Sequence, residues 1–204
     1  MSLSLEVGVH MNPGADAARV RAEFEAINSL LRQNGLSAHS EPLGGFERWG
    51  DNVGMWKNVY LLRRAAAHLH RDGKLPEPAG VDEPECDALG DLPDTVYPQV
   101  MGFDVDCIYV PVEFSKPLLP APSAAGVIDG RCVGSSVVLQ RECADLSRSL
   151  VRRSVRPPDL DRLIDGGQSR EEFVSGFEIE ARVCLRLWRA ASVSMASKAA
   201  LVFM

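Results

Sequence analysis

Alternating hydrophobic and polar residues predict strands at both ends of the chain and in its second half. Residues 3–11 alternate between the two kinds, which is typical of a half-buried strand. Residues 107–114 give the strongest pattern, because isoleucine, tyrosine and valine favour extended backbone. Pro111 lies inside that stretch and predicts an edge position or a bulge, because proline cannot donate to the ladder. Further extended candidates are residues 200–204, 36–42, 96–101 and 131–133.

Apolar residues spaced three and four apart predict helices between these strands. The predicted helices cover residues 15–33, residues 59–71, a stretch from Ser136 to about residue 150, and residues 170–197. Gly35 and Gly73 follow the first two, as expected at helix C-termini. Residues 43–58 between them contain four glycines and two tryptophans and are predicted to be an irregular loop.

Short strands separated by helices, without a repeating strand–helix–strand rhythm, predict an α+β fold. We expect a mixed sheet of about four or five strands covered by about four helices, as this class allows. The length of 204 residues fits a single domain over residues 1–204. Residues 74–95, which contain four prolines among acids and glycines, are predicted to be a long surface loop of that domain.

Acidic residues are concentrated in one part of the chain. Residues 75–115, called the acidic segment below, contain ten aspartates and glutamates and no lysine or arginine, so their charge is −10. Since the whole chain carries −6, the remainder carries +4. A solvated loop and a docking surface for a basic partner both fit this pattern. No concentrated basic stripe is present, so nucleic acid is not a predicted partner.

Five cysteines occur, an odd number with no C-x-x-C pair, which argues against a disulfide framework or a structural zinc site. All five are therefore predicted to be reduced. Cys143 and Cys184 lie in apolar helical stripes and are predicted to be buried. No apolar run is long enough to cross a membrane and no signal peptide pattern occurs, so we expect a cytoplasmic protein. No phosphate-loop or dinucleotide motif predicts a cofactor, and no metal ligand is assigned.

Three stretches carry a resemblance to a known family. Residues 104–114 read DVDCIYVPVEF and resemble D-C-E-G-Y-Y-x-P-V-D-F; residues 133–136 read VGSS and resemble I-G-S-S; residues 200–203 read ALVF and resemble A-I-V-F. These motifs are similar to those of an uncharacterised protein family of bacteria and plants with no assigned activity. The resemblance spans most of the chain and implies one domain. Asp106, Cys107 and Ile108 depart from the pattern, where the family has glutamate, glycine and tyrosine.

A pair of carboxylates is the first candidate for a ligand site. Asp104 and Asp106 are two apart on a predicted strand, so their side chains point to the same face. Like charges this close are unfavourable without a cation, hydrogen-bond donors or a raised pKa. We predict that they face a cleft with Tyr109, roofed by the loop that holds Trp49 and Trp56. The alternatives are a solvent-facing strand entry, or structural pairing with arginines, and the tryptophans also suit core cover.

Two weaker patterns could mark functional residues, but each also has a purely structural explanation. Gly134-Ser135-Ser136 precedes a helix, where free amides suit an anion but serine more often serves as the N-cap. The histidines have no metal-ligand spacing on one element, and each is expected to be a partly buried polar residue. Ser135, His39 and Asp104 supply the residue types of a catalytic triad, but only geometry identifies one.

Two functions from different classes follow. The first is a non-enzymatic interaction protein, similar to an immunity protein or inhibitor, that binds a basic protein through residues 75–95. The second is an enzyme acting on a small molecule or using a metal, with Asp104 and Asp106 in its site. The oligomeric state is not predicted.

Overall fold

The structure is a computed structural model. It describes residues 2–8, 17–42, 48–78, 96–101, 107–120, 128, 131–152, 155–156, 159–165 and 172–204. Asp104, Asp106, His10, Cys86 and most of the predicted loop at 74–95 lie outside these residues. Among the helices that the structure describes, none is long and apolar enough to cross a membrane.

Five short strands form one mixed sheet. They are β1 (Ser2–Val7), β2 (Trp49–Met55), β3 (Ile108–Val110), β4 (Val133–Ser135) and β5 (Leu201–Phe203), in the spatial order β2-β1-β5-β3-β4. β3 and β4 pair in parallel, and the other neighbours are antiparallel. The predicted C-terminal strand is confirmed. It is β5, the central strand of the sheet, and it lies between β1 and β3.

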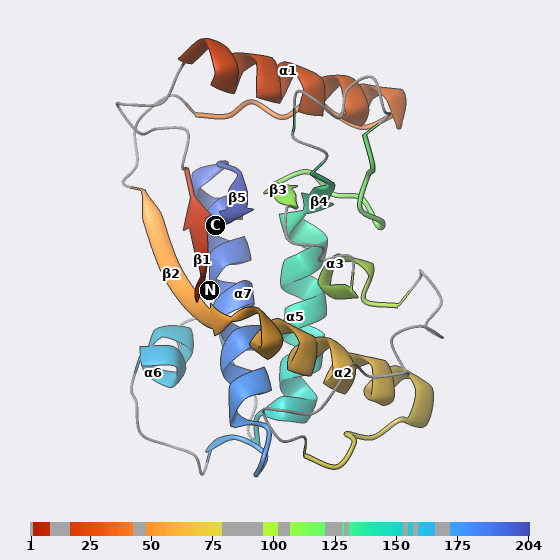
Figure 1. Cartoon of the computed structure of the whole chain (residues 1–204), viewed down its shortest axis with the longest axis vertical. Helices are drawn as coiled ribbons and strands as arrows, with labels where there is room; N and C mark the ends of the chain where they lie inside the picture. Colours follow the sequence, from red (N-terminus) through yellow and green to blue (C-terminus); the bar gives the residue numbers. More distant parts are fainter. Residues whose placement is uncertain are drawn as a thin grey trace.

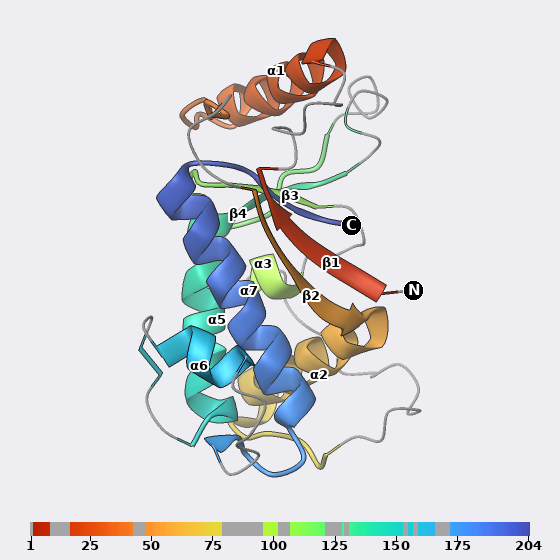
Figure 2. The same ribbon diagram turned by 90° about the vertical axis from the view of Figure 1, so that its left-hand side faces the viewer.

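Helices cover both faces of the sheet, as Figure 1 and Figure 2 show. α1 (Ala17–Gln33) lies across one face, where Ile27 and Leu31 pack against Ile108 and Val202. α2 (Trp56–Asp72), α5 (Ser136–Leu150) and α7 (Glu178–Ser197) lie on the other face, with the short helices α3 (Pro98–Met101) and α6 (Leu160–Asp165) beside them. Alternate residues of the inner strands β3 and β5 therefore enter two separate hydrophobic clusters.

The hydrophobic stripes of the long helices face the core as predicted. The stripe of α5 is fully buried; its members are Leu139, Cys143, Leu146 and Leu150. Gly35 and Gly73 have positive φ angles of 72° and 68°, which glycine adopts without strain at the end of a helix. The predicted α+β class, with a mixed sheet covered by helices, is confirmed.

Four local predictions were wrong. Residues 49–55 form strand β2 rather than a loop, because the ladder to β1 supplies the pairing that their glycine-rich sequence does not signal. Residues 98–101 form the helix α3 rather than an extended segment. The last helix begins at Glu178 rather than near residue 170. Pro111 lies just after β3, which is an inner strand of the sheet. The proline therefore ends the strand instead of marking an edge or a bulge.

The prediction that all five cysteines are reduced is also wrong. Cys107 and Cys132 form a disulfide, with 4.6 Å between their Cα atoms. They precede the paired residues Ile108 and Val133, so the parallel ladder places them side by side although they are 25 positions apart. Spacing along the chain does not reveal such a pair. The predicted burial of Cys143 and Cys184, which are free, is confirmed.

Candidate interaction site: the anchors of the acidic segment

The acidic segment is attached to the folded body at three places. The structure describes its residues 75–78, 96–101 and 107–115, which include Glu77 and Glu113. The other eight acidic residues lie outside the described parts; they are Asp82, Glu83, Glu85, Asp87, Asp91, Asp94, Asp104 and Asp106. The described parts show how the segment is attached to the rest of the structure.

The first anchor follows α2. Gly73 ends this helix, and its amide donates to the carbonyl of Leu69. The Arg64 guanidinium then donates to the carbonyl oxygen of Glu77 at 3.1 Å. Pro78 packs against Gly176 so closely that a Cβ atom added to this glycine would lie 2.6 Å from the proline ring. The chain is thus fixed at its last described residue before the main run of acids.

The second anchor is α3. The Glu142 carboxylate of α5 accepts hydrogen bonds from the amides at the N-terminus of α3. The amide of Gln99 lies 3.0 and 3.2 Å from the two carboxylate oxygens, and the amide of Val100 donates at 2.8 Å. Burial raises the pKa of Glu142 to about 7, although these two amides favour the charged form. The neighbouring Tyr97 hydroxyl donates to Asp145 at 3.2 Å. Burial, and to a lesser extent the negative charge of Asp145, raises the pKa of Tyr97 to about 12.

Gln99 links α3 to both strands of the parallel pair, to β4 through its side chain and to β3 through its backbone carbonyl. Its amide group donates to the carbonyl of Ser115 at 3.1 Å, and its oxygen accepts the Ser135 amide at 2.9 Å. The Tyr109 hydroxyl donates to the Gln99 carbonyl at 2.9 Å. Gly134 completes the arrangement, because a Cβ atom there would overlap the Tyr109 ring. These buried polar groups satisfy one another and therefore fix α3 against the sheet.

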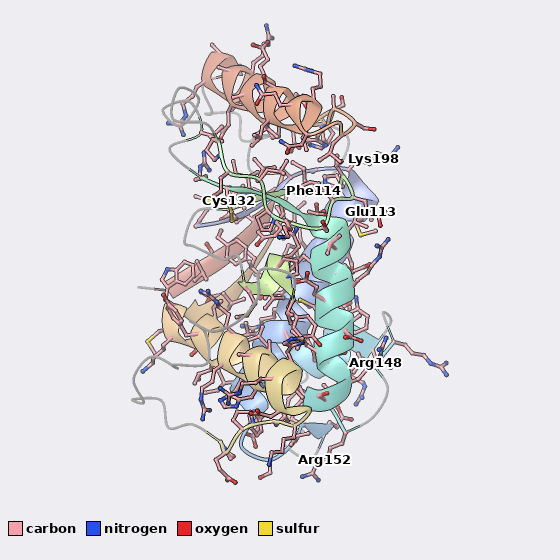
Figure 3. All side chains as sticks on the ribbon, turned by 90° about the vertical axis from the view of Figure 1, so that its right-hand side faces the viewer. Glu113, Phe114, Cys132, Arg148, Arg152 and Lys198 are labelled. Atoms are coloured by element: carbon pink, nitrogen blue, oxygen red, sulfur yellow. A yellow bond between two sulfur atoms is a disulfide. The ribbon has the colours of Figure 1, made fainter. Side chains whose placement is uncertain are left out.

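The third anchor is the Cys107–Cys132 disulfide, where the acidic segment enters β3. The Ile108 amide donates to the carbonyl of Cys132 at 2.9 Å, beside the bridge. Beyond β3, Glu113 forms an exposed ion pair with Arg141 at 2.5 Å. Figure 3 shows Glu113 and Phe114 at the N-terminal end of α5, with Cys132 further along the sheet.

The structure places three of the five predicted site residues. Tyr109 is fully buried, and burial raises its pKa well above the usual value. Trp49 and Trp56 are partly buried and pack against the main core, and the Arg189 guanidinium lies 5.5 Å from the Trp49 ring. Asp104 and Asp106 lie outside the described residues. The ligand site built from these five residues therefore stays a prediction.

The N-cap reading of Ser135 is confirmed, because its side-chain oxygen accepts the Val138 amide at 3.2 Å. Its hydroxyl also donates to the carbonyl of Val112 at 2.7 Å. His39 is buried and pairs with Glu41 at 2.6 Å, as expected for a buried polar histidine. His39 lines a cavity of about 510 Å³ between residues 37–40, residues 111–113 and the ends of α5 and α7. None of the five predicted site residues is among those that line it.

Sequence reasoning missed Gln99, Glu142 and the disulfide. Glu142 lies next to Cys143 in the predicted helix, and nothing in its sequence context distinguishes it from a solvent-exposed glutamate. Gln99 lies in a stretch without periodicity. Pairing between residues about forty positions apart carries no local signal. Among the described residues, no group of three or more histidines, cysteines or acids could hold a metal ion.

No curated protein and no solved structure matches the chain. A family described as "Putative DNA-mimic protein" matches residues 1–203. This description agrees with the predicted class of non-enzymatic interaction protein with an acidic surface; the mimicry of DNA was not part of that prediction. Because the match covers all but the last of the 204 residues, the chain belongs to the "Putative DNA-mimic protein" family.

Proposed function

We propose that this protein binds the DNA-binding surface of a basic protein, with the carboxylates of the acidic segment standing in for DNA phosphates. The observation that carries the proposal is the charge of this segment: ten acids and no cation within residues 75–115, in a family described as a DNA mimic. The partner is defined here by its chemistry, a surface of lysines and arginines that otherwise binds duplex DNA.

Electrostatics supports this partner class. Duplex DNA carries one negative charge per about 1.7 Å of its axis, and proteins neutralise it with lysine and arginine. A run of carboxylates without intervening cations offers the same partners to those side chains. It also repels nucleic acid, so we propose no direct contact with DNA or RNA. Charge complementarity of this kind speeds association and suppresses wrong partners.

The uneven distribution of charge supports a defined orientation. The acidic segment carries −10, and the rest of the chain carries +4. A basic protein is attracted to the segment and repelled by the remainder, so it approaches the segment side. The anchors at Glu77, at Gln99 and at Cys107 restrict the ends of the acidic stretches, which lowers the ordering cost of binding.

The test is displacement of DNA. A basic DNA-binding protein is saturated with fluorescent duplex DNA, and the chain is titrated in while anisotropy is read. We expect release of the DNA at 50 mM salt and a marked loss of this effect at several hundred millimolar, because exposed charges are screened beyond about 8 Å at 0.15 M salt. A panel of such proteins, each assayed alone, identifies the partner surface.

The variant that tests the segment neutralises four of its acids: Asp82→Asn, Glu83→Gln, Glu85→Gln and Asp87→Asn. A matched control neutralises four acids elsewhere: Glu25→Gln, Asp72→Asn, Asp161→Asn and Glu178→Gln. Both variants change the net charge by the same amount. We expect displacement to fall at least tenfold for the first and to change little for the second. Equal losses would show that net charge alone acts, and displacement by neither variant nor wild type would refute the function.

A further inference from the structure

The Cys107–Cys132 disulfide lies where the acidic segment joins the sheet. Cys107 is the residue directly before β3, and Cys132 directly precedes β4. Their Cα atoms are 4.6 Å apart, within the range of about 4.4–6.8 Å that a disulfide spans. Only 2% of Cys107 and 8% of Cys132 is exposed. The bridge is therefore a built part of the fold, aligned by the parallel ladder.

In the described part of the chain, the ladder that joins these two strands is short. The β3–β4 ladder contains three residue pairs, from Ile108 with Val133 to Val110 with Ser135. A ladder this short is marginal without further support, and parallel pairing is slightly weaker per residue than antiparallel pairing. The covalent bridge closes a loop of 25 positions, a length for which a disulfide typically stabilises the folded state.

The same strand pair carries the second anchor of the acidic segment. Tyr109 on β3 donates to the Gln99 carbonyl, and the Ser135 amide on β4 donates to the Gln99 side chain. These bonds require a fixed distance between the two strands. A change in the separation of β3 and β4 therefore reaches α3, which is the anchor in the middle of the segment.

We propose that this disulfide is a redox-controlled clamp on the acidic segment, which holds its attachment points when oxidised and loosens them when reduced. The step is thiol–disulfide exchange with a dithiol reductant, which reaches the buried bridge when this end of the short ladder opens locally. The reductant supplies two electrons and two protons, the bond between the two sulfur atoms breaks, Cys107 and Cys132 become thiols, and the reductant becomes a disulfide. The inference rests on the proposed function for its effect on binding, and on the structure alone for its effect on the strands.

The structural arm of the test uses hydrogen exchange on the full chain. The non-reduced protein should yield a peptide in which the two cysteines are cross-linked. After reduction with dithiothreitol, amides of β3 and β4 should exchange at least tenfold faster, while those of α1 change little. The Cys107→Ser/Cys132→Ser variant should match the reduced protein and show no response to dithiothreitol. Absence of the cross-link, or equal exchange in both forms, would overturn the clamp.

The binding arm uses fluorescent poly-L-lysine of defined length as the basic probe. We expect the oxidised protein to bind it at least threefold more tightly than the reduced protein, and the double variant to bind like the reduced form with and without reductant. Equal affinities despite faster exchange would overturn redox control of binding. If neither form binds poly-L-lysine while exchange still responds to reduction, the proposed function fails and the effect of the bridge on the strands stands.

Discussion

Replacing Glu142 with glutamine tests the buried carboxylate that holds α3. The wild-type side chain accepts hydrogen bonds from the amides of Gln99 and Val100 and is 8% exposed. Burial disfavours its charged form and raises its pKa from 4.5 to about 7. Glutamine has nearly the same shape and does not titrate, so the pair of proteins isolates the effect of this one charge.

The sign of the pH effect follows from linkage. A carboxyl with a higher pKa in the folded state binds its proton more tightly there, so its contribution to stability is greatest below pH 4.5 and falls as the pH rises to about 7. A tenfold change in proton affinity is worth 1.36 kcal/mol. The rise from 4.5 to about 7 therefore corresponds to about 3 kcal/mol, as an order of magnitude.

The assay is urea unfolding of both proteins at several pH values between 4.5 and 8. The free energies of unfolding should be close at the acidic end, since protonated glutamate and glutamine each offer one good acceptor to the α3 amides. The wild type should then lose up to about 3 kcal/mol relative to Glu142→Gln by pH 8. Parallel curves would refute the reasoning. A wild type that gains relative stability would show that the amide hydrogen bonds outweigh burial and lower this pKa.

Three further predictions concern stability and reactivity. Gly134→Ala should lower the free energy of unfolding by roughly 2 kcal/mol, because the added methyl overlaps the Tyr109 ring. Gly50→Ala is the control, since a Cβ atom there meets nothing nearer than 3.7 Å. Urea unfolding measures the stability of both variants. Arg189→Met should cost about 1.5–3 kcal/mol because it removes the charged hydrogen bond to the partly buried Asp51, which keeps only the longer contact to Arg186. Asp161→Asn, at a side chain 79% exposed, should cost under about 1 kcal/mol, and thermal melts that rank the two variants in reverse would contradict this. The free cysteines of α5 and α7 should resist a native thiol reagent and react only on unfolding.

Local patterns predicted the elements whose burial has a regular period. The α5 stripe from Leu139 to Leu150 and the alternating residues of β1 each match one face of the core. The pattern failed where pairing comes from distant residues. Gly50 and Gly54 hide the strand character of β2, which exists because β1 pairs with it along its whole length. α3 has four residues, too few for a period, and its amides find their acceptor on Glu142.

The same distinction, between local patterns and pairing with distant residues, explains how much of the candidate site the sequence could predict. The acidic segment was visible because charge is a property of composition and needs no knowledge of contacts. Its anchors were not visible, because each joins residues that are distant in sequence: Arg64 with Glu77, Glu142 with α3, and Cys107 with Cys132. Tyr109 was singled out as a ligand-site residue for its place beside the acids, and the structure puts its hydroxyl in the buried network of Gln99.

Several buried polar side chains lie in or against α3. A core of this size needs no buried carboxylate to fold, and burying one is unfavourable unless it is hydrogen-bonded. Yet Glu142, Gln99, Ser135 and Tyr109 form a buried polar network, and each contacts α3, the described middle part of the acidic segment, or is part of it. An aliphatic side chain in place of Glu142 would fill similar space but leave the α3 amides without an acceptor. The network is therefore best understood as the support that fixes α3, and with it the described middle part of the acidic segment, against the sheet.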